Sequence, residues 1–282
     1  MRIVFFGSSK YVVPVIQMLH NYFDLALVVT TEQGKQEPVL FYCKTNNINY
    51  LSVRKSEDLL SSYQINEAMA SLGIVADFGL IIPQKTINAF PYGIINIHPS
   101  LLPKYRGPTP VQSAILNGDT LTGVTIIKLD KYLDHGPVIA QVEEEIKPED
   151  TADSLYEKLF KKGALLLEKV LPKYETSQVL FVPQNHEHAT FTKKLTREDG
   201  YIDFKNFSPS RDFFDRMVRA YYPWPGVWTR VDLNFDGQAK IIKFLPNRKI
   251  QVEGKKEMDY KDFLNGYPNA DKDLIEFIKK NI

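Results

Sequence analysis

Three polar side chains stand where predicted strands end. Asn96 and His98 lie two residues apart in IINIH, and Asp134 lies in LDHG between two further apolar runs. Side chains alternate along a strand, so Asn96 and His98 share one face. Two polar groups would be costly in the middle of a buried strand. We therefore expect both at its carboxyl end, where ligands bind in open α/β sheets.

An amide, an imidazole and a carboxylate suit the transfer of a carbonyl group to an amine. Asn96 can donate an N–H to the developing oxyanion, a role worth roughly 3 kcal/mol in other acyl-transfer enzymes. His98 can donate a second hydrogen bond or move a proton, and Asp134 can orient the imidazole or take the amine proton through a water. We see no activated Ser or Cys nearby, which favours direct attack by the substrate. The spacing alone also fits structural roles, with Asp134 as a turn residue.

The elements that position these residues alternate in type. Short apolar runs (IVFFG, LALVVTT, GIVADF and GIINIH) predict buried parallel strands, with helical stretches such as 12–19 and 114–117 between them. This alternation predicts an α/β, Rossmann-like domain with a mostly parallel sheet over residues 1–185. TGVTIIKL and PVIAQVEE predict two more strands, and a helix begins near Thr151.

The second half has a different pattern. We interpret residues 186–205 as a linker and residues 206–282 as a small β-rich domain, similar to an OB barrel, with a terminal helix. VWTRVDL, AKIIKFL and KIQVEG are short strand-like runs broken by turn residues, and DKDLIEFIKKNI has helical spacing.

Composition excludes several classes of protein. The net charge of +1 means that a nucleic-acid partner must be held by local patches. Cys43 is the only cysteine, so the chain has no internal disulfide and no thiolate metal cluster. No apolar run reaches the roughly 20 residues of a membrane span, and the start does not fit a signal peptide. We expect a cytoplasmic monomer.

The segments INIHPSLLPKYRGPTPVQSAILNG, TGVTIIKLD and LDHGPV resemble the core of the 10-formyltetrahydrofolate-dependent formyltransferases. In that family the Asn, His and Asp at these motif positions are catalytic, which implies those roles for Asn96, His98 and Asp134. The resemblance also implies 10-formyltetrahydrofolate as the donor and no metal. Two segments are implied to contact the folate: Ser100, Leu101, Leu102 and Pro103, and Phe78, Gly79, Leu80 and Ile81.

VFFGSSKYVVPVI, KKLTREDGYIDF, RAYYPWPGVWT and VEGKKEMDYKDFLNGYP resemble the branch of the family that formylates tRNA. This implies the α-amine of methionyl initiator tRNA as the acceptor. The loop TTEQGKQEP is shorter than the basic loop of the bacterial enzymes, so most tRNA contacts are expected from the second domain. The candidate cations are Lys35, Lys240, Lys243, Arg248, Lys249, Lys255 and Lys256; such a run can also be a solvated face.

Other acceptors and other sites remain open. A sugar-nucleotide N-formyltransferase would have nearly the same core motifs, and a formyltetrahydrofolate hydrolase would use the same donor with water as the acceptor. A silent tRNA-binding protein would not need an intact Asn96, His98 and Asp134. The dinucleotide motif GxGxxG is absent. His186 and His188 could ligate a metal but lack a third ligand in the sequence. The aromatics Tyr221, Tyr222, Trp224 and Trp228 could stack on bases or form a core.

Overall fold

The computed structural model describes residues 1–282 except 33–37, 205, 207–208, 234–237 and 282. The chain forms two compact units. The first contains Met1–Pro110, Leu121–Glu145 and Tyr156–Thr192, and the second contains Val111–Thr120, Ile146–Leu155 and Lys193–Ile282.

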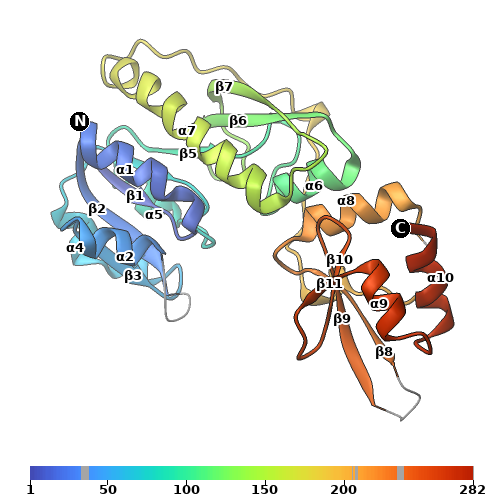
Figure 1. The fold of residues 1–282 in the computed structure, drawn as a ribbon. Helices are drawn as coiled ribbons and strands as arrows, with labels where there is room; N and C mark the ends of the chain where they lie inside the picture. The colour runs from blue at the N-terminus through green and yellow to red at the C-terminus, as the bar shows by residue number, and fades with distance from the viewer. Residues whose placement is uncertain (33–37, 205, 207–208, 234–237, 282) are drawn as a thin grey trace. The chain divides into compact units, whose positions relative to one another are not determined.

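A seven-stranded sheet forms the centre of the first unit (Figure 1). Its strand order is β3-β2-β1-β4-β5-β6-β7, with β1 to β5 parallel and β6 and β7 antiparallel. This confirms the predicted mostly parallel α/β sheet, and β3 is an addition that the sequence analysis did not contain. The strands are β1 (Arg2–Phe6), β2 (Asp24–Thr31), β3 (Tyr50–Val53), β4 (Leu72–Val75), β5 (Ile94–His98), β6 (Leu121–Lys128) and β7 (Val138–Glu145).

Helical segments lie between these strands or follow the last of them. They are η1 (Lys10–Val12), α1 (Val13–Tyr22), α2 (Pro38–Thr45), α3 (Asp58–Ser61), α4 (Tyr63–Glu67), α5 (Gln84–Ile87) and η2 (His186–His188), and α7 (Ala152–Glu175) starts in the second unit and continues in the first. Phe6 on β1 anchors the core on one side of the sheet, where its ring meets Phe78 and Phe90 edge-on at 5.6 and 6.1 Å.

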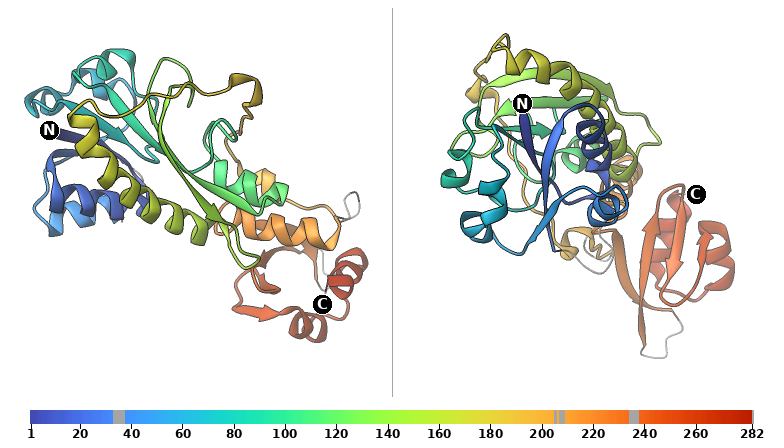
Figure 2. Two further views of the ribbon diagram at one scale, coloured as in Figure 1. Left: turned by 90° about the horizontal axis from the view of Figure 1, so that it is seen from above. Right: turned by 90° about the vertical axis from the view of Figure 1, so that its left-hand side faces the viewer.

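Helix α7 runs along the sheet of the first unit (Figure 2). It approaches β5 and β6 closely at Gly163. A Cβ atom at this position would lie 2.8 Å from Ile97 Cγ2 and 3.4 Å from Val124 Cγ1. Ile97 therefore points toward α7. Because side chains alternate along β5, Asn96 and His98 point to the opposite face, as the sequence predicted.

We expect Gly163→Leu to lower the free energy of unfolding by roughly 1–3 kcal/mol, the usual cost of overpacking a filled core. Chemical denaturation with a matched Leu165→Ala control measures the effect. Leu165 is on the same helix and is 61% exposed, so the control should change stability by only about 0.5 kcal/mol. Unchanged stability in Gly163→Leu would show that the helix can move away from the sheet without cost.

The second unit has a four-stranded antiparallel sheet of order β11-β10-β9-β8. Its elements are α6 (Pro110–Asn117, from Val111 onward), η3 (Arg197–Gly200), α8 (Arg211–Tyr221), β8 (Val227–Asp232), β9 (Ala239–Leu245), β10 (Lys249–Val252), β11 (Glu257–Asp259), α9 (Tyr260–Gly266) and α10 (Lys272–Asn281). Phe244 on β9 meets Phe214 of α8, Tyr260 of α9 and Phe277 of α10. These helices therefore cover one face of the small sheet. Across the described parts of both units, none of the helices is long and apolar enough to cross a membrane.

Candidate active site

Strand β5 holds Asn96 and His98 at its carboxyl end between two different neighbours. Asn96 is level with Val75 of the parallel strand β4 and with Ile127 of the antiparallel strand β6. His98 is level with Thr125 of β6 and is 4% exposed. The backbone of β5 is therefore paired on both sides at Asn96 and with β6 at His98.

Asp134 lies close to both of these residues. Its Oδ1 accepts a hydrogen bond from Asn96 Nδ2 at 3.1 Å, and its Oδ2 accepts one from the backbone N–H of Gly107 at 2.8 Å. His98 Nδ1 is 3.7 Å from Oδ2. The structure thus brings together the three residues that the sequence singled out, 38 positions apart in the chain between Asn96 and Asp134.

The imidazole of His98 has one nitrogen committed to the fold. Its Nε2 lies 2.9 Å from the carbonyl oxygen of Tyr105. A carbonyl oxygen only accepts hydrogen bonds, so Nε2 must carry a hydrogen. Nδ1, which faces Asp134, is then the atom that can gain or lose a proton. Proton exchange at this residue is therefore directed toward the carboxylate.

The loop from Ser100 to Pro103 is tied to the sheet by its backbone. Thr125 Oγ1 donates to the carbonyl of Ser100 at 2.6 Å and accepts from the N–H of Leu102 at 3.1 Å. Gln141 Nε2 donates to the carbonyl of Leu102 at 3.1 Å. The side chains of Ser100 and Leu102 are buried. Leu101 and Pro103 are the partly exposed members of the loop.

The other segment with an expected folate contact has mixed exposure. Phe78 is 3% exposed and belongs to the core, with Leu80 packed against the same cluster. Gly79 has a φ of 79°, in the region that favours glycine. Ile81 is 82% exposed. Phe78 therefore supports this segment from beneath, and Ile81 is the side chain that it presents.

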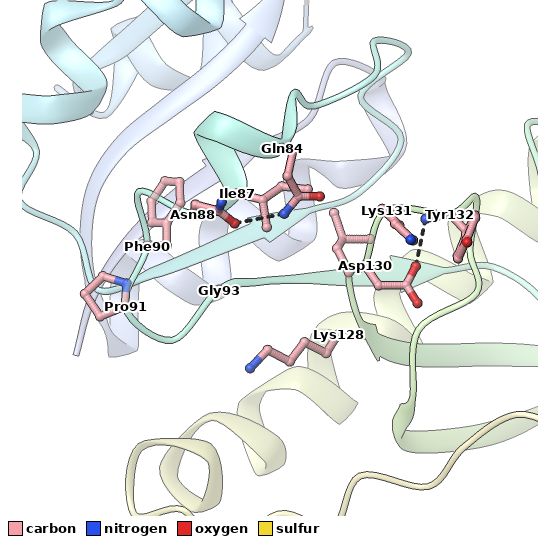
Figure 3. Close-up of a pocket in the computed structure, with 11 residues that line it drawn as sticks. Gln84, Ile87, Asn88, Phe90, Pro91, Gly93, Lys128, Asp130, Lys131 and Tyr132 are labelled. Carbon is pink, nitrogen blue, oxygen red and sulfur yellow. Dashed lines mark hydrogen bonds between the residues drawn. The ribbon is translucent and has the colours of Figure 1, made fainter.

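A cavity of about 730 Å³ lies between α5 and the segment that follows β6 (Figure 3). Gln84, Ile87 and Asn88 line one side, and Gln84 Nε2 donates to Asn88 Oδ1 at 2.8 Å. The opposite side is formed by Lys128, Leu129, Asp130, Lys131 and Tyr132. The segment that continues from this wall carries Asp134, and the lining residues were not predicted from the sequence.

The candidate RNA-binding cations do not share one surface. By strand alternation, Lys243 and Lys249 point away from the face that carries the core residue Phe244, and Lys240 points to the same side as Phe244. Lys249 Nζ is 3.0 Å from Asp259 Oδ1. The remaining cations, Arg248, Lys255 and Lys256, are exposed, and Lys35 lies outside the described residues.

Register also places aromatic and basic residues together, in what we call the Trp228 cluster: Arg197, Tyr201, Trp228, Arg230 and Lys243. Trp228 is level with Lys243 across the β8–β9 pair. The Arg197 guanidinium lies 4.9 Å from the Trp228 ring centroid, and the Tyr201 ring lies 4.8 Å from it. Four of the five, with Glu198, line a cavity of about 330 Å³. Arg197, Tyr201 and Arg230 were not predicted from the sequence.

Two other sequence candidates are distributed between core and surface. Tyr221 is 7% exposed and belongs to the core, whereas Trp224 is 54% exposed.

His186 Nδ1 lies 2.8 Å from Arg106 Nη2, and the His186 ring stacks on His135 at 4.0 Å. Burial, His135 and Arg106 together lower the pKa of His186. Burial also raises the pKa of the Cys43 thiol to about 11, which makes it unsuitable as a thiolate nucleophile.

The first unit combines a mostly parallel sheet with an amide, an imidazole and a carboxylate gathered at the carboxyl end of β5. Residues 1–171 match the formyl transferase family model. The chain therefore belongs to the formyltransferase family.

Curated relatives confirm the resemblance to the branch that formylates tRNA. A methionyl-tRNA formyltransferase from Chloroflexus aurantiacus is 38% identical over 238 residues, covering 81% of this chain and 76% of the relative. Another from Koribacter versatilis is 35% identical and covers 96% of this chain and 97% of the relative.

Solved structures share the fold. A 4-N formyltransferase from Francisella tularensis has a TM-score of 0.67 at 19% identity, covering 87% of this chain and 98% of its own. The sugar 3N-formyl transferase WlaRD, solved with dTDP and 5-N-formyl-THF, has a TM-score of 0.62 at 23% identity, covering 91% and 99%.

Proposed function

We propose that this enzyme transfers a formyl group from 10-formyltetrahydrofolate to the α-amine of methionyl initiator tRNA. The observation that carries the choice of acceptor is that similarity to a methionyl-tRNA formyltransferase extends over 96% of the chain, and so includes the second unit. The adjacent Asn96, His98 and Asp134 support the chemistry.

In the proposed mechanism the neutral amine attacks the formyl carbon. A C–N bond forms, the carbonyl oxygen becomes negative, and the amine nitrogen must lose a proton. The Asn96 amide nitrogen carries two hydrogens. One points to Asp134, and the second can donate to the oxyanion. Collapse of the intermediate breaks the bond to the folate nitrogen N10, which takes up a proton.

Proton transfer in this scheme runs through Nδ1 of His98, because Nε2 donates to the carbonyl of Tyr105. The Asp134 carboxylate faces Nδ1 at 3.7 Å and stabilises the imidazolium when it forms. The amine can therefore pass its proton to Nδ1, directly or through a water, and the same atom can return it to N10.

We place the donor in the cavity between α5 and the segment after β6. Its volume of about 730 Å³ is within the usual range for small-molecule sites. Amide groups of Gln84 and Asn88 suit the polar edge of a pterin, and Ile87 offers an apolar wall. Lys128 and Lys131 offer positive charge to the carboxylates of the donor's glutamate tail (Figure 3).

An acceptor panel tests this function. Purified enzyme with 10-formyltetrahydrofolate is offered methionyl-tRNA, an amino-sugar nucleotide, or water alone, and the formylated product or released formate is measured. We expect formylmethionyl-tRNA as the main product. A faster reaction with the sugar nucleotide or with water would replace the proposed acceptor while leaving the donor chemistry in place.

We further propose that the Trp228 cluster contacts the RNA, because guanidinium groups bind phosphates and aromatic rings stack on bases. The double variant Arg230→Gln/Lys243→Gln should weaken tRNA binding. It should also reduce the slope of log affinity against log salt by about 1.8, at about 0.9 for each lost phosphate contact on a duplex. Binding measured across a salt series gives both quantities.

Lys279→Gln/Lys280→Gln is the matched control, since it removes the same charge from α10, the helix whose Phe277 packs beside Phe244 on the other face of the sheet. Lys255→Gln/Lys256→Gln tests the expectation from sequence in the same assay. Equal losses in the control and in the Trp228-cluster variant would mean that only net charge matters, and would remove the cluster from the proposal.

A further inference from the structure

The turn that carries Asp134 has a conformation that needs support from its surroundings. Asp134 has a φ of 46°, in the left-handed region that costs energy for residues with a side chain. Two residues later, a Cβ atom on Gly136 would lie 1.8 Å from the carbonyl oxygen of Lys128. The backbone is therefore both strained and tightly enclosed, and contacts from elsewhere must hold it.

Gln184 supplies two of these contacts. Its Nε2 donates to the carbonyl of Asp134 at 2.9 Å and to the carbonyl of Gly136 at 2.8 Å. An amide nitrogen has two hydrogens, so both are used on this turn. Gln184 is 7% exposed. A flipped amide would put its oxygen against two carbonyl oxygens, so the orientation is decisive.

Arg106 fixes that orientation. Its Nε and Nη2 donate to Gln184 Oε1 at 3.2 and 2.6 Å. A guanidinium group only donates, so the amide oxygen must face Arg106 and the amide nitrogen must face the turn. Arg106 is 3% exposed, which protects these bonds from water.

The segment after Gln184 is bound to the same loop as Arg106. The N–H of Arg106 donates to the carbonyl of Thr190, and the N–H of Thr192 donates to the carbonyl of Arg106, each at 2.8 Å. The next residue in the loop, Gly107, donates its N–H to the Asp134 carboxylate. The loop and the 184–192 segment therefore hold the turn at its backbone and at its side chain.

We infer that Gln184, oriented by Arg106, is a positioning residue that aims the Asp134 carboxylate at Asn96 and His98. Gln184 hydrogen-bonds to the backbone of the turn, so it acts on Asn96 and His98 through the position of Asp134. Arg106 also brings charge: burial lowers its pKa, and the negative charges of Asp134 and Asp130 oppose that lowering.

The kinetic test uses Gln184→Met, which keeps the length of the side chain and removes both donors. We expect kcat to fall about tenfold or more, with KM for the donor changed by less than about threefold. In an Asp134→Asn background the same substitution should change kcat by less than about twofold, because Gln184 acts through Asp134. Gln178→Met, an exposed glutamine after α7, is the matched control and should leave kcat unchanged.

The second readout does not depend on any acceptor. Amide hydrogen exchange at Gly107 reports its bond to Asp134, and the Thr192 amide serves as the internal reference. Gln184→Met should speed exchange at Gly107 about tenfold and leave Thr192 within about threefold. The exchange measurement is valid even if the proposed formyl acceptor is wrong, whereas the kinetic measurement rests on the proposed function.

Two results would overturn the inference. One is unchanged exchange at Gly107 in Gln184→Met, and the other is an equal loss of kcat from this substitution in the parent enzyme and in the Asp134→Asn background. If Gln184→Met does not fold, Arg106→Lys replaces it in both assays, since it keeps the charge but not the forked donor geometry. We expect Arg106→Lys to speed amide exchange at Gly107, as Gln184→Met does, and to lower kcat by a smaller factor. The same two results would count against the inference.

Discussion

Asn96→Ala is expected to lower kcat for formyl transfer by about two to three orders of magnitude, because the substitution removes the N–H that we propose donates to the developing oxyanion. It also removes the donor to Asp134 Oδ1, which is 3.1 Å away. Affinity for the folate donor should change by less than about threefold, since the α5 cavity and the Ser100–Pro103 loop remain. Steady-state kinetics and donor titration measure the two effects separately.

The matched control for this prediction is Asn66→Ala. Asn66 is exposed on α4, and its replacement should leave turnover unchanged. His98→Ala, which removes the proton-exchanging Nδ1, should cost a similar two orders of magnitude. Turnover close to that of the parent enzyme in either active-site variant would remove that residue from the mechanism.

The second large effect concerns pH. The proposed mechanism uses the Asp134 carboxylate and a neutral amine, so the rate of the parent enzyme should rise from acid toward neutral pH. Asp134→Asn keeps the shape of the side chain and removes its charge. The rate should fall by about 10²- to 10⁴-fold, and the part of its pH dependence that comes from the carboxylate should disappear.

Rate profiles from acid to neutral pH measure this, with Asp24→Asn as the control. Asp24 is exposed at the start of β2, and its replacement should preserve both the rate and the profile. An unchanged profile in Asp134→Asn would mean that Asp134 is only a turn residue and that the acid-sensitive group lies elsewhere.

Strands β1, β2, β4, β5 and β6 could be predicted because each is a compact apolar run between polar or glycine residues. β3 was missed since its four residues, YLSV, are short and only its last residue is buried. Asn96 and His98 could be placed on one face from the two-residue period alone. The approach of Asp134 could not be predicted from spacing, because it depends on a left-handed turn held by distant residues.

The segment 184–192, which helps to hold that turn, has no hydrophobic periodicity in its sequence. Gln184 precedes a region interpreted as a linker, and its polar composition is typical of solvent-exposed chain. Its burial follows from pairing with Arg106, 78 positions earlier, which no local pattern indicates. The Trp228 cluster was missed for a similar reason, since only the β8–β9 register brings Lys243 beside Trp228.

The contact between Arg106 and Gln184 also has a consequence for how the enzyme is made. A ribosome synthesises Asn96, His98 and Asp134 well before it reaches Gln184, and domains form from the amino terminus as the chain emerges. Until that point, the turn at Asp134 lacks the two hydrogen bonds from the glutamine amide. The geometry of the turn at Asp134 is therefore completed late, only after α7 and the segment that follows it have left the ribosome.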